Sequence, residues 1–494
     1  MTRPAPRRTA LAAAALAALV AAAAPEPAAQ GIGDRLYPHL GNPGYDVRAY
    51  DIALHYSGDN TEPLRAVTTV EARATAPLDR FNLDFARGAV SAVRVNGAPA
   101  TFSNVGEDLV VTPAEPVPEG APLRVGIAHT SDPGTGADGG WVRTDDGLVM
   151  ANQADAAHRV FPCNDHPSDK ALFTFRVTAP RDFTVVAGGL RTARRPGRTT
   201  TTWEYRGAHP MATELAQVSI GRSAVLRRRG PHGLPVRDVV PAADRRRMER
   251  WAARTPGQVA WMERQVGRYP FETYGLLIAG TRTGFELETQ TLSLFERRLF
   301  TDPRFTEAYV ESVMVHELAH QWFGDSVSPA RWSDVWLSES HATWYEARWA
   351  EERAGVPLVE RMRRAYAQSD AWRATGGPPA APKPPEPGQK IGIFRPVVYD
   401  GSALVLYALR QRIGPAAFDR LERTWAGRYR DGHAATADFV ALASEVSGRD
   451  QSGFLRPWLY GARTPAMPGH PDWRTGPAAP AAQPGARHRA GKPV

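Results

Sequence analysis

The sequence has little cysteine: Cys163 is the single one among 494 residues. No intrachain disulfide can form, so a disulfide-stapled scaffold is excluded. There is also no visible internal repeat, and after residue 30 no apolar run is long enough for a membrane-spanning helix. What is present is an ordinary globular mixture, 43% hydrophobic and 23% charged, with chain enough for about three domains.

An excess of positive charge is missing from the body of the chain. The formal net charge is +8, but residues 1–30 contribute +2 and residues 474–494 contribute +4, which leaves +2 for residues 31–473. No basic stripe with interleaved aromatic residues is visible either. We therefore expect no nucleic-acid partner.

The first 30 residues have the pattern of a secretion signal. Three arginines, at positions 3, 7 and 8, precede an uninterrupted apolar run from Leu11 to Ala24, and small residues follow around Ala28. The run is short for a bilayer span, so we predict a signal peptide over residues 1–30 and a secreted, extracellular protein without stable membrane insertion. An uncleaved anchor is the alternative, and the arginine pair leaves the Sec and twin-arginine export routes open.

The chain then divides into two regions of different pattern. From Tyr45 to about Val225, short segments rich in Val, Leu, Thr and aromatic residues alternate with turn signals, which predicts an antiparallel β domain over residues 45–235. Helical spacing dominates from there on, starting with one expected helix over Arg245–Val266. The sequence thus predicts an α+β protein of at least two domains.

The second domain is expected over residues 236–472 and mainly helical. Past Trp473 the chain consists largely of Pro, Gly, Ala and Arg, which predicts a disordered tail over residues 474–494.

One short motif carries chemistry, His316-Glu317-Leu318-Ala319-His320, inside a predicted helix over Phe305–Trp322. Histidines four positions apart lie on one helical face and can bind one metal ion together. Glu317, next to the first of them, is placed to accept a proton from a metal-activated water. Taken alone, the motif also fits two core-facing histidines beside a solvated glutamate.

A third ligand strengthens the metal hypothesis. Glu339 lies 19 positions after His320, near the start of the next predicted helix, and the intervening Gly324, Ser328 and Pro329 supply a turn. Two antiparallel helices would bring its carboxylate beside the histidines. Two His and one Glu leave zinc an open position, as in catalytic sites, so we expect one Zn²⁺ ion as cofactor.

At this point the sequence resembles the M1 (gluzincin) family of zinc aminopeptidases. The segments that carry the resemblance are His316–Gly324, Trp336–Glu339, Phe161–Pro167, Lys170–Phe173 and Val398–Arg410. It extends over about residues 45–472. It implies a saddle-like β domain followed by a thermolysin-like catalytic domain, in a short form without the C-terminal helical domain of larger members. We expect a monomer that acts on a peptide or protein N-terminus.

The resemblance also implies three further site residues. Tyr399 matches the tyrosine whose hydroxyl stabilises the negative charge on the scissile carbonyl. Glu288 matches the glutamate that binds the substrate amine, and Gln153 falls at a substrate-contacting glutamine. The amine-binding motif is altered, however, because Phe285 and Thr289 stand where the family has glycine and asparagine.

The predicted function is removal of N-terminal amino acids by zinc-activated water. Two other functions remain open. One is a zinc endopeptidase of the thermolysin type, because that class shares the metal motif and the amine-binding motif is altered here. An inactive, zinc-bearing binding protein is the third. His341, two positions after Glu339, is not expected to be a fourth ligand.

Overall fold

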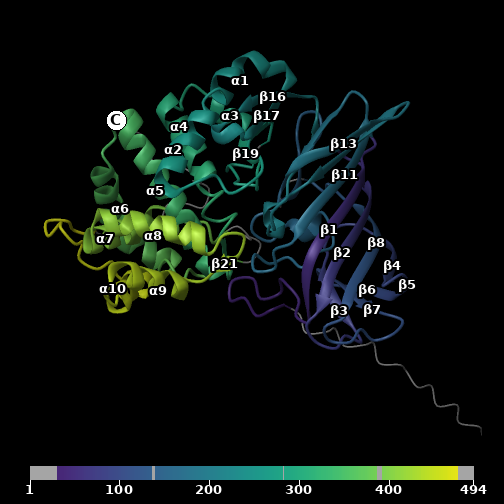
Figure 1. Cartoon of the computed structure of the whole chain (residues 1–494), viewed down its shortest axis with the longest axis horizontal. Helices are drawn as coiled ribbons and strands as arrows, with labels where there is room; N and C mark the ends of the chain where they lie inside the picture. Colours follow the sequence, from purple (N-terminus) through teal and green to yellow (C-terminus); the bar gives the residue numbers. More distant parts are fainter. Residues whose placement is uncertain (1–30, 136–138, 282, 387–391, 477–494) are drawn as a thin grey trace, which may run out of the picture.

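The computed structural model describes residues 31–135, 139–281, 283–386 and 392–476. The predicted signal peptide and residues 477–494 of the predicted tail lie outside these ranges. Figure 1 shows a β-rich part, which holds the N-terminal half of the chain, beside a mainly helical part. Among the described residues, no helix combines the length and the apolar character needed to cross a bilayer.

The β-rich part is built on an eight-stranded sheet. Its order is β13-β14-β11-β1-β2-β8-β4-β5. Buried and exposed side chains alternate along the long strands, so one face lies on the core and the other faces solvent. The strands are β1 (Tyr45–His55), β2 (Leu64–Ala74), β4 (Val90–Val95), β5 (Ala98–Pro99), β8 (Pro122–Ser131), β11 (Leu172–Pro180), β13 (Leu190–Pro196) and β14 (Thr200–Arg206).

Two smaller antiparallel sheets complete this part. One contains β3 (Phe81–Asp84), β7 (Asp108–Thr112) and β6 (Thr101–Val105); the other contains β12 (Thr184–Ala187), β15 (Val218–Gly221), β10 (Leu148–Ala151) and β9 (Gly140–Arg143). The predicted β domain is confirmed, with one difference: β1 and β11 pair in parallel. Period-two alternation reports which face of a strand is buried but not the direction of its neighbour.

The helical part carries a sheet of its own, β16-β17-β18-β19, in which β17–β18 and β18–β19 are parallel pairs. These strands are β16 (Ser223–Arg229), β17 (Pro235–Pro241), β18 (Leu276–Ala279) and β19 (Ser293–Glu296). The predicted boundary after residue 235 therefore falls inside this sheet, with β16 on its N-terminal side. A short parallel pair joins β20 (Ser328–Pro329) to β21 (His433–Ala434).

Ten α-helices are present among the described residues. They are α1 (Arg245–Ala252), α2 (Thr255–Val266), α3 (Arg297–Thr301), α4 (Glu307–Ala319), α5 (Trp336–Ala354), α6 (Leu358–Gly376), α7 (Asp400–Ile413), α8 (Pro415–Arg428), α9 (Thr436–Ser447) and α10 (Ser452–Tyr460). The single helix predicted over Arg245–Val266 is wrong. Pro256 lacks an N–H and would clash with the carbonyl of Ala252, where α1 ends.

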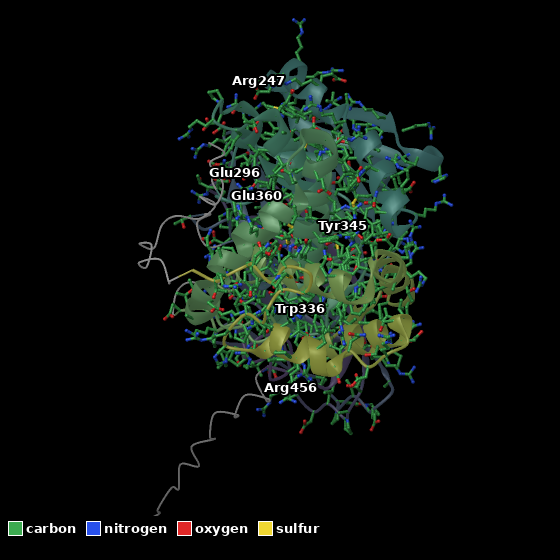
Figure 2. The ribbon with its side chains drawn as sticks, turned by 90° about the vertical axis from the view of Figure 1, so that its left-hand side faces the viewer. Arg247, Glu296, Trp336, Tyr345, Glu360 and Arg456 are labelled. Atoms are coloured by element: carbon green, nitrogen blue, oxygen red, sulfur yellow. The ribbon has the colours of Figure 1, made fainter. Side chains whose placement is uncertain are left out.

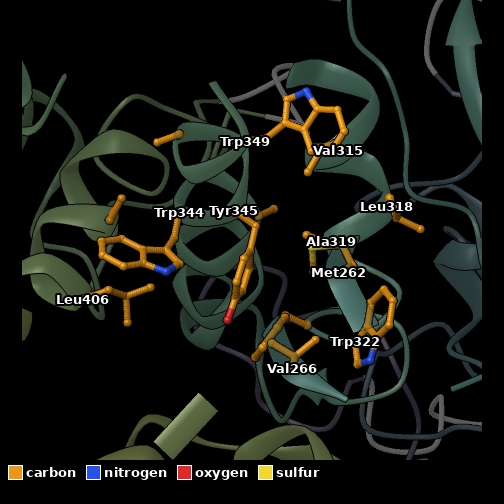
Figure 3. Packing of buried hydrophobic residues seen from close by; sticks show 14 of the residues in the cluster. Met262, Val266, Val315, Leu318, Ala319, Trp322, Trp344, Tyr345, Trp349 and Leu406 are labelled. Carbon is orange, nitrogen blue, oxygen red and sulfur yellow. The ribbon is translucent and has the colours of Figure 1, made fainter. Parts of the chain in front are cut away.

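Buried side chains of the helical part pack against α4. Figure 3 shows Val315 and Ala319 of α4 on the side that faces Met262 of α2 and Tyr345 of α5, and Leu318 belongs to the same buried cluster. These side chains are buried, and they fix the rotation of α4 about its axis. Figure 2 shows Trp336 and Tyr345 inside the body, whereas Arg247 and Arg456 lie at opposite ends.

The last described residues pack on the helical part. The backbone N–H of Gly476 donates a 2.7 Å hydrogen bond to the carbonyl of Ala367 in α6. Trp473 is buried and stacks on Tyr407, with ring centroids 5.9 Å apart. The predicted disordered tail is therefore ordered as far as residue 476.

Candidate active site

The helix that carries the metal motif is well defined at its start. Thr306 caps α4 by accepting a hydrogen bond from the backbone N–H of Tyr309 at 3.2 Å. Three turns on, the rings of His316 and His320 lie side by side with centroids 4.9 Å apart. The i, i+4 spacing thus brings both imidazoles to one face of α4.

Glu339 reaches the histidines from the first turn of α5. Its Oε2 atom lies 3.4 Å from Nε2 of His316 and 3.5 Å from Nε2 of His320. The predicted antiparallel helix pair therefore brings the three predicted ligands together, with their ligand atoms all within 4.8 Å of one another.

Both imidazoles are held through their other nitrogen. Nδ1 of His316 donates to Oε2 of Glu346 at 3.2 Å. Nδ1 of His320 contacts the carbonyl oxygen of Phe323 at 3.2 Å and Oγ of Ser338 at 2.9 Å. These contacts fix the tautomer that turns each Nε2 toward Glu339, as is usual for histidines that bind metal.

Gly324 makes this packing possible. It follows the metal motif with φ of 132°, a backbone conformation that favours glycine. A Cβ at this position would overlap Oγ of Ser338 and come within 3.3 Å of Nδ1 of His320. Any larger residue would displace the hydroxyl that supports the second histidine.

The three ligands suit a divalent cation. Oε2 of Glu339 is buried and has no hydrogen-bond partner among the described residues, although both histidines face it. Burial alone would raise the pKa of Glu339, but His320 and His316 lower it to about 2, so the carboxylate is charged. Two nitrogens and one carboxylate oxygen form the donor set of catalytic zinc sites.

Glu317 is buried next to the ligands. Its Oε2 atom has no hydrogen-bond partner within the described ranges. Burial raises the pKa of Glu317 well above its usual value, and the carboxylates of Glu288 and Glu286 raise it further, whereas His320 opposes them. A carboxyl group whose proton affinity is raised in this way suits general acid–base work.

Glu288 lies beside Glu317, on the loop between β18 and β19. Ligand atoms of Glu288, Glu317 and His320 fall within 4.8 Å of one another. Gln153, which follows β10 in the β-rich part, donates from Nε2 to Oε1 of Glu288 at 2.7 Å. Burial and the nearby Glu339 raise the pKa of Glu288, while His320 and the Gln153 hydrogen bond lower it, with a net upward shift.

Tyr399 lies beside His316, immediately before α7. Its ring centroid lies 6.1 Å from that of His316. Burial raises the pKa of Tyr399 well above 10, and the carboxylates of Glu339 and Glu288 add to the effect. The hydroxyl therefore keeps its proton and acts as a hydrogen-bond donor. With Tyr399, all seven predicted site residues lie around one centre.

The structure adds polar residues that sequence analysis missed. Glu346, which holds His316, is on the same face of α5 as Glu339, two turns on, so the helical period gave a usable signal. Its own partner Arg361 comes from α6, which the pattern did not predict. His341 is turned away from the centre: its ring stacks on Phe323, and Nε2 lies 3.3 Å from Oε1 of Glu422.

Comparison with known families agrees with this geometry. The profile of the Peptidase family M1 domain matches residues 259–458, and that of the Peptidase M1 N-terminal domain matches residues 146–215. The chain belongs to peptidase family M1. For a member of this family, the cluster of His316, His320 and Glu339 implies a Zn²⁺ cofactor.

Solved M1 structures share the fold. An M1 zinc metallopeptidase from Deinococcus radiodurans is 28% identical with a TM-score of 0.75, and the match covers 89% of this chain and 99% of that one. A two-domain M1 zinc metallopeptidase variant bound to L-tryptophan gives a TM-score of 0.76 at 28% identity. The two-part α+β architecture predicted from the M1 resemblance is thereby confirmed.

Curated relatives are longer. Aminopeptidase N of Streptomyces lividans is 25% identical over 434 residues, which cover 84% of this chain but 50% of that protein. Leucyl aminopeptidase of Saccharolobus solfataricus is 23% identical over 66% of this chain and 42% of that protein. The chain thus spans about half the length, or less, of the curated relatives it matches.

Proposed function

We propose that this M1 protein is a zinc aminopeptidase that removes single residues from the N-terminus of peptides. The observation that carries the proposal is the place of Glu288. Its carboxylate lies within 4.8 Å of Glu317 and His320. An acid at this distance can hold the α-ammonium group of a substrate one residue away from the bond that is cleaved.

The zinc ion, held by His316, His320 and Glu339, would supply Lewis-acid chemistry that polarises the scissile carbonyl and acidifies water. Glu317 accepts the proton of the attacking water and returns it to the leaving amine. Tyr399 donates a hydrogen bond to the carbonyl oxygen as negative charge develops on it.

Glu288 and Gln153 bind and orient the substrate. An α-ammonium group has three N–H donors, and the paired Glu288 carboxylate and Gln153 amide offer acceptor oxygens on one side of the centre. Together they set the distance between the amine and the first peptide bond. Several relatives named aminopeptidases support this assignment.

The deciding experiment compares an aminoacyl amide with its N-acetylated counterpart, with and without chelator. We expect cleavage of the free amine only, loss of activity with chelator and recovery with zinc. Equal cleavage of both substrates would instead support a thermolysin-type endopeptidase, in line with the altered Phe285 and Thr289 positions. Zinc binding without hydrolysis of any peptide would support the inactive binding protein.

We also propose that the enzyme acts outside the cell. The support is the sequence pattern of residues 1–30, in which arginines precede the apolar run from Leu11 to Ala24. Expression of the full chain in a bacterial host tests this. Mature protein in the culture medium with a new N-terminus agrees with export, and uncleaved protein in the membrane fraction contradicts it.

A further inference from the structure

Arg361, in the first turn of α6, binds two carboxylates from different helices. Its Nη1 donates to Oε1 of Glu346 at 2.8 Å, and its Nη2 lies 3.3 Å from Oε2 of the same group. Its Nε donates to Oδ1 of Asp400 at 2.8 Å. Each of the three guanidinium nitrogens therefore contacts a carboxylate oxygen, and the planar head cannot rotate without losing a contact.

On one side, Glu346 also contacts the zinc ligand His316. Oε2 of Glu346 accepts from Nδ1 of His316 at 3.2 Å, so one carboxylate is shared between the imidazole and Arg361. Glu346 is thus held by hydrogen bonds from both sides, and it sets the orientation of the His316 ring.

On the other side, Arg361 binds the residue that follows Tyr399. Asp400 is the next residue after Tyr399 and the first residue of α7. The backbone that leaves Tyr399 is therefore tied to α6 by the Arg361–Asp400 bond, and the Tyr399 ring lies 6.1 Å from that of His316.

The three charged side chains are partly buried, with exposures of 23% for Arg361, 15% for Glu346 and 25% for Asp400. Removing one member of a partly buried ion pair leaves the remaining charges without their partner, at a cost that solvent screening reduces. A lysine cannot replace this arginine, since one ammonium group does not reproduce a planar fork with two faces.

We propose that Arg361 is a positioning residue. Through Glu346 it fixes the orientation of the zinc ligand His316, and through Asp400 it fixes the position of the Tyr399 hydroxyl. The expected effect on kcat rests on the proposed function. The expected effect on zinc affinity does not, because zinc binding can be measured without catalysis. The positioning role predicts two separable effects, one on zinc binding through Glu346 and one on turnover through Asp400.

The test uses the full chain and the variants Arg361→Gln, Glu346→Gln and Asp400→Asn. Zinc affinity is measured by competition with a chromophoric chelator, and kcat and KM with an aminoacyl amide at saturating zinc. For Glu346→Gln we expect about 10–100-fold weaker zinc binding. For Asp400→Asn we expect unchanged zinc affinity but about 10-fold lower kcat at constant KM. Arg361→Gln should show both defects.

Arg363→Gln is the matched control, because Arg363 lies on the same helix and pairs with Glu360 at 3.2 Å on the surface. It should bind zinc and turn over substrate like the wild type. Arg361→Lys should not restore both properties. Far-UV circular dichroism and the melting temperature check that each variant folds.

The proposal is overturned if Arg361→Gln folds and keeps both wild-type zinc affinity and wild-type kcat. If that variant does not fold, the two milder variants decide: wild-type zinc affinity in Glu346→Gln, or wild-type kcat in Asp400→Asn, contradicts it. A wild-type protein that binds zinc but cleaves no peptide refutes the proposed function. Weaker zinc binding in Glu346→Gln and Arg361→Gln would still support the role of Arg361 in positioning His316.

Discussion

Gln153 donates a 2.7 Å hydrogen bond to the carboxylate of Glu288, so a side chain from the β-rich part holds the loop that we assign to amine binding. The two parts of the chain thus build this subsite together, and neither completes it alone. The bond sets the direction of the Glu288 carboxylate.

Loss of this bond should weaken substrate binding rather than turnover. For Gln153→Ala we expect KM for an aminoacyl amide to rise about 10–100-fold, because a hydrogen bond to a charged group is worth about 1.5–3 kcal/mol. The change in kcat should stay within about twofold, since Gln153 touches no reacting atom. Steady-state kinetics measure both values. Unchanged KM in Gln153→Ala, with a large increase in Glu288→Gln, would remove Gln153 from the subsite.

The second prediction concerns the proton carrier. Glu317→Gln keeps the size of the side chain but cannot accept a proton, so kcat should fall by about 10²–10⁴-fold. Zinc content by elemental analysis should equal that of the wild type, because Glu317 is not a ligand. Glu311→Gln, the same substitution two turns earlier on α4, is the control. Wild-type turnover in Glu317→Gln would show that another group carries the proton.

The predictable part of the site is the part set by local geometry. His316 and His320 share a helical face by their spacing alone, and a short turn brings Glu339 back from the next helix. These relationships involve about one helical hairpin, and the structure reproduces them. Tyr399, Glu288 and Gln153 come from distant segments, and the family resemblance placed them where spacing could not.

The less predictable part depends on long-range packing. The Arg361 contacts need α6 to lie against α7, and the sequence analysis did not predict a helix over Leu358–Gly376. The parallel pairing of β1 with β11 has the same origin, since it joins residues more than a hundred positions apart. Local pattern carries no information on such contacts.

The third prediction separates Tyr399 from the metal. Tyr399→Phe retains the ring beside His316 and removes only the donor that faces the developing charge. We expect kcat to fall by about 10²–10³-fold with little change in KM or zinc affinity. Tyr460→Phe serves as control, because Tyr460 is 50% exposed on the surface. Equal kcat in both variants would exclude a role for the Tyr399 hydroxyl.

The fourth prediction links the metal to stability. Zinc binds the folded site and relieves repulsion among Glu288, Glu317 and Glu339, so chelation should lower the melting temperature. At free zinc 100-fold above Kd, the stabilisation is about 2.7 kcal/mol. Differential scanning fluorimetry measures the shift with and without zinc. In Glu339→Gln the zinc-dependent shift should be largely lost, and a full shift in this variant would place the metal elsewhere.

The fifth prediction concerns the pH dependence of folding and lies far from the site. His129 on β8 is 4% exposed, its Nε2 lies 2.9 Å from Oγ1 of Thr68, and burial lowers its pKa to about 4. The folded protein therefore favours the neutral imidazole. Its stabilising contribution is complete above the unfolded pKa of 6.5 and is lost as the pH falls through about 4.

The shift corresponds to about 3 kcal/mol, because each pKa unit is worth about 1.4 kcal/mol. Urea unfolding of the zinc-saturated protein between pH 4 and pH 7, compared with that of His129→Gln, measures the contribution of His129 to the free energy of unfolding. The difference in unfolding free energy between the two proteins should narrow as the pH falls from 6.5 toward 4. A constant difference would mean that His129 titrates alike in the folded and unfolded chains, and that the buried Thr68–His129 contact does not exclude the proton.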